Sequence, residues 1–144
     1  MIYSYFGQGT KYSIMLNLET VVGDIANIAY VDFQRIYDTG VGPEKFPGCF
    51  INDIIERKET ILANITKNTF HVGVVFWVRA EDDENLWEKL DAFGQSIITA
   101  IMSDPTRGSN AYSSRVTQIE TDKGSRHPVA VGVIVLEIIY FSGN

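Results

Sequence analysis

The stretch that decides the fold is VAVGVIVLEIIYF, residues 129–141. Apolar residues occupy both sets of alternate positions, a pattern typical of a β-strand with two apolar faces. One side carries Val129, Val131, Val133, Val135 and Ile139, and the other carries Ala130, Ile134, Leu136 and Ile138. Helices packed on one sheet face would leave the opposite face apolar, and such an uncovered face is more typical of a binding surface than of a solitary monomer. We therefore expect this strand to take part in self-association.

The segments before this strand show two kinds of periodicity. Helical spacing of apolar residues predicts helices from Thr10 to Gly23 and from Asp82 to Ile101. Alternation predicts further strands at 25–37, 49–55, 70–79 and 115–121. We expect polar or Gly- and Pro-rich connections at 38–48, 56–68 and 103–114, the first and last of them exposed loops.

The predicted order of elements is α-β-β-β-α-β-β, which indicates an α+β fold. We expect a single domain over residues 1–144, with a mostly antiparallel sheet of about five strands and two helices packed on one face. Residues 1–9 are predicted to be an N-terminal arm. At the junction of this arm with the first helix, Gly7-Gln8-Gly9-Thr10 lacks the third glycine of a dinucleotide fingerprint and the Gly-Lys-Ser/Thr ending of a P-loop, so we expect a bend that starts the helix.

Composition narrows the classes of function. The chain has 144 residues and a net charge of -6, which argues against a sequence-independent nucleic-acid binder, because such a protein needs a clustered basic face. The N-terminus lacks the pattern of a secretory signal, and the longest apolar run is too short to span a bilayer, so we expect a soluble product of a cytoplasm. The lone Cys49 cannot form an internal disulfide.

The titratable residues do not form a known catalytic or metal-binding pattern. Cys49 lies in a strand pattern, where a small buried hydrophobe is its expected role, and neither His71 nor His127 has metal-ligand spacing. We therefore expect no cofactor and no metal. Glu137 is the only charged residue between Pro128 and Phe141. It could act with Asp32 in acid/base chemistry, or serve as a strand-edge charge or as a salt-bridge partner of Arg35 or Arg79, and we favour the structural roles.

The order of elements, together with the phrases VDFQRIY, FPGCFIN, VGVVFWV and SRVTQIETDKG, resembles the tail terminator (tail completion) proteins of long-tailed bacteriophages. The resemblance runs from about Thr10 to Phe141. It implies a non-enzymatic ring, usually of six subunits, that caps the tail tube, stops its polymerisation and meets the head connector or neck protein. It also implies a place in the virion at the head-proximal end of the tail, assembly in the host cytoplasm, passage of the genome through the ring, no sequence-specific nucleic-acid binding and no membrane partner.

Site residues follow from the strand pattern and from this resemblance as hypotheses. Contacts between subunits are expected on the exposed side of the last strand, at Val131, Val133, Val135 and Glu137. Axial contacts with tube or connector are expected at Lys45, Phe46, Arg107, Tyr112 and Arg115. Two alternatives stay open: another tail or head-closure protein such as a tube or neck component, or a small α+β enzyme or ligand-binding module with a pocket near Glu137 and His71.

Overall fold

The computed structural model describes residues 11–25, 28, 30–33, 46–122 and 127–143. Its elements are α2 (Lys11–Gly23), β1 (Tyr30–Phe33), β2 (Gly48–Leu62), β3 (Ile65–Arg79), α3 (Asp83–Met102), β4 (Ser113–Thr121) and β5 (Val129–Gly143). This order confirms the predicted α+β class and its α-β-β-β-α-β-β arrangement. The predicted N-terminal arm, residues 1–9, lies outside the described residues.

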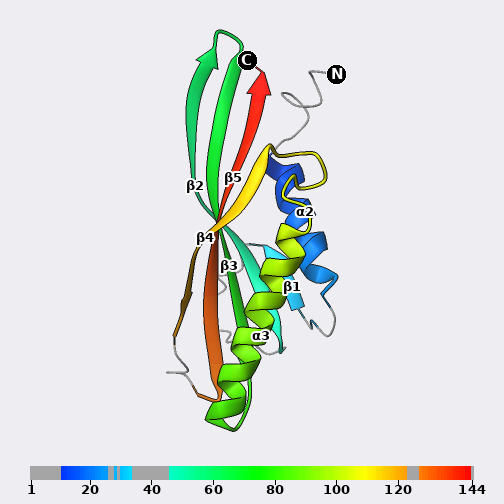
Figure 1. Ribbon diagram of the computed structural model, residues 1–144, viewed down its shortest axis with the longest axis vertical. Helices are drawn as coiled ribbons and strands as arrows, with labels where there is room; N and C mark the ends of the chain where they lie inside the picture. The colour runs from blue at the N-terminus through cyan, green and yellow to red at the C-terminus, as the bar shows by residue number, and fades with distance from the viewer. Residues whose placement is uncertain (1–10, 26–27, 29, 34–45, 123–126, 144) are drawn as a thin grey trace.

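The strands form one sheet in the order β1-β2-β3-β5-β4. The long apolar strand β5 pairs antiparallel with β3 on one side and with β4 on the other. β2 pairs antiparallel with β3, while the short β1 runs parallel to β2. The strands β2, β3 and β5 run along the long axis of the molecule and twist about it (Figure 1).

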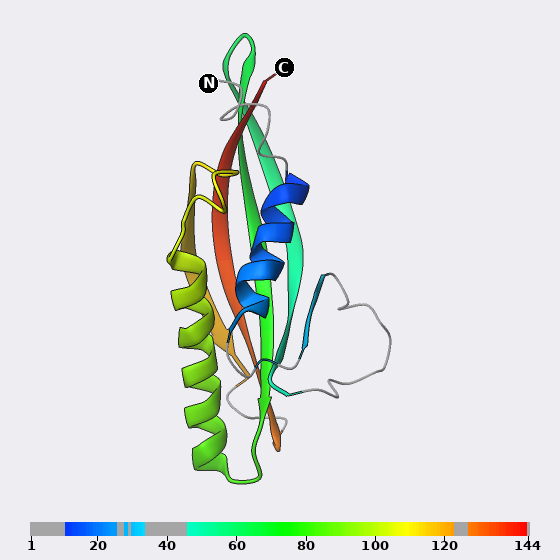
Figure 2. The same ribbon diagram turned by 90° about the vertical axis from the view of Figure 1, so that its right-hand side faces the viewer.

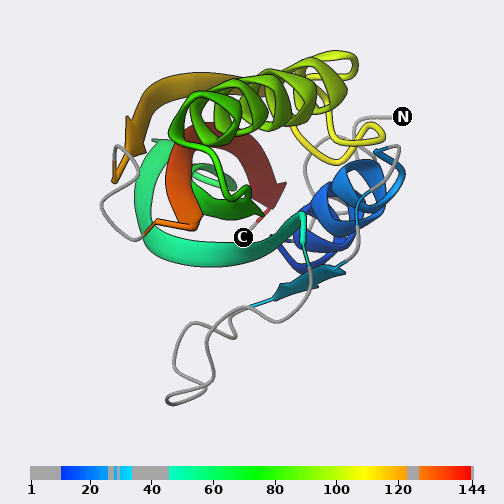
Figure 3. The ribbon, with the colours of Figure 1, turned by 90° about the horizontal axis from the view of Figure 1, so that it is seen from below.

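Both helices cover the same face of this sheet, as Figures 2 and 3 show. Alternate residues of the two central strands point toward the helices and are buried. From β3 these are Phe70, Val72, Val74, Phe76 and Val78, and from β5 Ala130, Ile134, Leu136, Ile138 and Tyr140. The helices bury Ile14, Leu18 and Val22 from α2, and Leu86, Leu90, Phe93, Ile97 and Ile101 from α3. The core therefore lies between the helix layer and one sheet face.

Two glycines make room for a large ring in this core. Phe76 of β3 is opposite Gly132 of β5 in the strand register, and a Cβ atom at Gly132 would overlap its ring. On the other side, a Cβ atom at Gly94 of α3 would lie only 3.1 Å from the same ring, which also packs edge-on against Phe93 with centroids 6.0 Å apart. The ring of Phe76 is thus packed between β5 and α3, at positions where each of them has a glycine.

The polar segment 56–68 is not a simple connection, as its composition suggested. β2 and β3 continue through it in register, from Glu56 opposite Phe70 to Thr60 opposite Thr66, and only Ala63 and Asn64 lie outside the strands. We call residues 56–68 the hairpin arm. It extends along the long axis beyond both helices (Figure 1). The strands continue there because strand pairing depends on backbone hydrogen bonds and needs no apolar core. The alternation of apolar residues in the sequence indicates only which side chains are buried.

Candidate interaction surface

The sheet face turned away from the helices is apolar, and we call it the open face. β5 contributes Val131, Val133, Val135 and Ile139, β3 contributes Val75 and Trp77, and β2 contributes Phe50 and Ile54. Ile54 and Val133 approach each other across Gly73, since a Cβ atom placed there would lie 3.3 Å and 3.7 Å from their side chains. Ile54 is 52% exposed, whereas the valines of β5 are partly buried and Trp77 is only 4% exposed. Within the described part of the chain, both helices lie on the other side of the sheet (Figures 1 and 3).

A polar row crosses the open face at one level of the strand register. Arg115 of β4 is opposite Glu137 of β5, which is opposite His71 of β3. Arg115 Nε donates to Glu137 Oε1 at 2.9 Å, and His71 Nε2 lies 3.6 Å from Glu137 Oε2. From the sequence, Arg35 or Arg79 was considered as a salt-bridge partner of Glu137, beside a role as a strand-edge charge. Arg79 in fact pairs with Glu81 at 3.2 Å, and Arg35 lies outside the described residues.

Register explains why Arg115 was missed as a partner of Glu137. Cross-strand neighbours on one face pair directly, but which residues are neighbours depends on a bulge between Val116 and Gln118 in β4. That bulge leaves no clear signal in the sequence. The carboxylate of Glu137 is nonetheless held by neighbours on both sides, which supports the structural roles favoured for it.

The expected axial residues do not form one cluster. Lys45 lies outside the described residues. Phe46 carries the guanidinium of Arg79 above its ring, with 6.0 Å between Cζ and the ring centroid. Tyr112 is 67% exposed and packs edge-on against Phe141 with centroids 5.5 Å apart, and Arg115 belongs to the polar row.

Arg107 differs from its predicted role. Its side chain is 0% exposed, and its guanidinium Nη2 donates to the carbonyl oxygens of Ile101 and Asp104 at the C-terminal end of α3. A helix leaves its last carbonyls without partners, and a cation there also complements the helix dipole. Burial lowers the pKa of Arg107, and the nearby carboxylate of Asp104 acts in the opposite direction. A buried side chain cannot contact tube or connector, so the prediction of an axial contact at this residue is wrong.

The turn around Arg107 is organised by Asp104. The Asp104 carboxylate accepts hydrogen bonds from the hydroxyl and the amide of Thr106 and from the amide of Gly108. The hydroxyl of Thr106 is the largest cause of a lowered pKa at Asp104, followed by these amides. Positive φ angles of 53°, 67° and 68° at Arg107, Gly108 and Ser109 show how tightly the chain turns.

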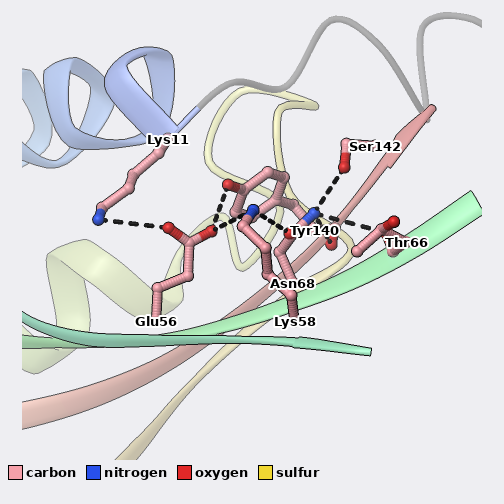
Figure 4. Close-up of polar contacts among 7 residues, drawn as sticks. All are labelled: Lys11, Glu56, Lys58, Thr66, Asn68, Tyr140 and Ser142. Atoms are coloured by element: carbon pink, nitrogen blue, oxygen red, sulfur yellow. Dashed lines mark hydrogen bonds and ion pairs between the residues drawn. The ribbon is translucent and has the colours of Figure 1, made fainter. Parts of the chain in front are cut away.

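A second polar cluster fixes the hairpin arm to α2 (Figure 4). Glu56 accepts a hydrogen bond from Tyr140 Oη at 2.7 Å and pairs with Lys11 of α2 at 3.4 Å. Lys58 Nζ lies 3.3 Å from Glu56 and donates to Asn68 Oδ1 at 2.7 Å. Fully buried Asn68 in turn donates to Ser142 Oγ at 2.9 Å.

The charge of Glu56 is stabilised by this cluster. Burial raises the pKa of Glu56, but the hydrogen bond from Tyr140 and the charges of Lys58 and Lys11 outweigh it, so its pKa lies below the ordinary value. The sequence pattern predicted no role for these residues. The only signal was a run of polar residues flanked by apolar strands, which fits a loop equally well.

Cys49 and His127, which were considered for chemistry from the sequence, lie in different surroundings. Cys49 is fully buried, as expected, and burial raises the pKa of its thiol to about 12. His127 lies at the surface, with Nε2 3.2 Å from Asp83 Oδ1. Among the described residues, no group of three or more His, Cys, Asp and Glu could hold a metal ion. In the same residues, no helix is long and apolar enough to cross a membrane.

A groove of about 250 Å³ lies at the end of the β4–β5 pairing. Its lining residues are Glu120, Thr121, Asp122, Val131, Gly132 and Val133. His71 and Glu137, around which a ligand pocket was considered, lie on the open face and do not line this groove. Part of the groove is instead continuous with the open face through Val131 and Val133.

No protein-family model matches the chain, and no curated protein matches it. Among solved structures, one chain of a particle described as "Virion of native gene transfer agent (GTA) particle" matches 94% of this chain over 96% of its own length. The sequence identity is 8% and the TM-score is 0.44. A likeness this weak supports no inference about function.

Proposed function

We propose that this protein is a structural virion protein of a long-tailed bacteriophage that forms a closed ring, caps the tail tube, ends its polymerisation and joins the tail to the head connector. The observation that supports this most is the open face, where Val131, Val133 and Val135 form an apolar strip that neither described helix covers. The order of elements, which resembles that of tail terminator proteins, supplies the specific role and the number of six subunits.

Physical chemistry connects the open face to assembly. Apolar surface exposed to water costs about 25 cal/mol per Å², and a neighbouring copy that covers it recovers this free energy. A closed ring made from one repeated contact leaves no unsatisfied end, unlike a filament. Such a ring can terminate a tube if one of its faces matches the tube and the other does not present the surface on which tube subunits stack. The role is non-enzymatic, since it needs only binding surfaces.

The proposal is tested by measuring the mass of the purified protein and of Val133→Asp by sedimentation velocity over a range of concentrations. Val133 is only partly buried on the open face, so the variant should fold, which far-UV circular dichroism checks. We expect the parent to form a discrete oligomer and Val133→Asp to be monomeric, because a carboxylate buried in the contact would lose its hydration. Thr20→Asp, on the exposed side of α2, adds the same charge elsewhere and should assemble like the parent.

Electron micrographs of the parent, alone and mixed with tube protein, provide the second measurement. Rings in the absence of tube, and tubes capped at one end in its presence, are the expected images. Open filaments of the protein alone would favour a tube component instead. A parent that stays monomeric at high concentration and in contact with tube protein would contradict the proposal.

A further inference from the structure

Two surfaces at opposite ends of the molecule complement each other in charge and in apolar character. One is the hairpin arm, at one end of the long axis, and the other is the outer side of the first turns of α3, at the other end (Figure 1). Because they lie so far apart, the two surfaces of one molecule cannot meet each other. They could meet between neighbouring copies.

The surface of α3 consists of one stripe along the helix. Glu84, Trp87, Glu88 and Asp91 follow one another at steps of three, one and three residues, so they share one side of the helix. All four are exposed, and Trp87 is 48% exposed in spite of its large apolar ring. Within the described part of the chain, none of the three carboxylates has an ion-pair partner. We call these four residues the α3 stripe.

The hairpin arm carries the opposite features. Ile61 and Leu62 near its tip are 47% and 61% exposed. Below the tip, Arg57 and Lys67 lie on the same face of the arm, and no ion pair among the described residues involves either cation. Glu59 is the one carboxylate of the arm on this face, opposite Lys67, whereas Glu56 on the other face is already paired with Lys11 and Lys58.

We infer that the hairpin arm of one copy docks on the α3 stripe of the next copy, with Ile61 and Leu62 against Trp87 and with Arg57 and Lys67 near Glu88 and Asp91. The partner of each surface is a second copy of the chain, because the chain itself provides both the hairpin arm and the α3 stripe. Each of these surfaces carries solvated charges of one dominant sign. This contact joins different patches on the two molecules, as a ring requires. The inference rests on the proposed function, to which it adds the second pair of surfaces.

The usual contributions of Trp and of charged residues to binding energy favour Trp87 as the centre of the contact. Buried Trp residues dominate the binding energy of many interfaces, while charged residues at the rim mainly set orientation and association rate. We therefore expect Trp87→Ala to weaken association more than any single charge reversal does. Its partial exposure in the free subunit means that the fold should not depend on it.

Two charge-reversed variants test the inference. The arm variant is Arg57→Glu with Lys67→Glu, and the stripe variant is Glu88→Lys with Asp91→Lys. In a solution of either variant alone, the hairpin arm and the α3 stripe carry charges of the same sign and repel each other. We therefore expect association about tenfold or more weaker than that of the parent. In an equimolar mixture, each arm meets a stripe of opposite sign at every junction of an alternating ring, so association should return to that of the parent.

The readouts are sedimentation velocity and quenching of tryptophan fluorescence by acrylamide. Trp77 is only 4% exposed, so quenching reports mainly on Trp87, and assembly should protect it. Asp24→Lys, an exposed charge reversal just beyond α2, is the matched control for Glu88→Lys and should assemble like the parent.

The outcomes separate the two proposals. If the arm and stripe variants assemble as tightly as the parent while Val133→Asp is monomeric, the arm contact is overturned and the ring stands. Failure of the mixture to recover association also overturns the arm contact, because misfolding or general charge effects would then explain the single variants. A monomeric parent overturns both proposals.

Discussion

Among single residues, the glycines around Phe76 place the tightest limit on the packing of the core. Gly132→Ala adds a methyl group where the Phe76 ring lies, and that ring is 1% exposed with Phe93 on its other side. We expect a loss of about 1–3 kcal/mol in the free energy of unfolding, as for other overpacked cores. Urea denaturation measures it.

The control for this substitution is Gly23→Ala at the exposed end of α2, where alanine should be neutral or slightly stabilising. A smaller side chain should relieve the overlap, so Phe76→Leu in the Gly132→Ala background is expected to cost less than Phe76→Leu in the parent. Equal costs in both backgrounds would show that Phe76 and Gly132 are not coupled.

Glu56 links the stability of the hairpin arm to pH. Its folded pKa lies below the ordinary value, so its charge stabilises the fold above that value, and the contribution is lost as the pH falls through the folded pKa. Glu56→Gln should lower the free energy of unfolding by about 1–2 kcal/mol at pH 7 and by much less near pH 3. Chemical denaturation at a series of pH values checks this.

Glu59→Gln removes an equal charge from the exposed part of the same arm and serves as the comparison. It should leave the acid part of the stability profile unchanged. If Glu56→Gln shifted the profile by the same amount at every pH, then the ion pair and hydrogen bonds of this carboxylate would not be the source of its effect.

At the scale of elements, the C-terminal end of α3 depends on Arg107. Arg107→Ala leaves the carbonyls of Ile101 and Asp104 without their donor and opens a cavity in a fully buried position. We expect a loss of about 2–4 kcal/mol, measured by thermal or urea unfolding. Arg115→Ala, which removes an exposed arginine from the polar row, should cost less than about 1 kcal/mol. Similar losses for the two variants would contradict the structural role of Arg107.

The elements that the sequence predicted well are those with a buried side. The alternation of 129–141 and the helical spacing of 82–101 both record burial against the same core, and both elements lie within a few residues of their predicted ends. The hairpin arm was missed because its strands have polar side chains on both faces, held by hydrogen bonds such as those of Asn68. Arg107 was misplaced because Gly, Pro and Ser around it are typical of an exposed turn, and nothing local indicates that α3 needs a donor there.

At the scale of the molecule, the open face was foreseeable while its details were not. Two helices on one side and apolar residues on both sides of β5 require an apolar second face, and β5 has it. The polar row and the arm depend on register and strand length, which alternation alone does not determine. The proposed ring consequently has contacts of two kinds: an apolar one at the open face and a charged one between hairpin arm and α3 stripe.

These two kinds of contact should respond differently to salt. At 1 M NaCl the screening length falls to about 3 Å, so the attraction between Arg57 or Lys67 and the acidic stripe should largely vanish, whereas the apolar contact should persist. We expect the dissociation constant of the parent, measured by sedimentation in 0.05 to 1 M NaCl, to rise toward that of the arm variant. The arm variant should tighten with salt, because in it screening removes a repulsion. A parent whose association does not change across this range would lack the charged contact, and its assembly would depend on the open face alone.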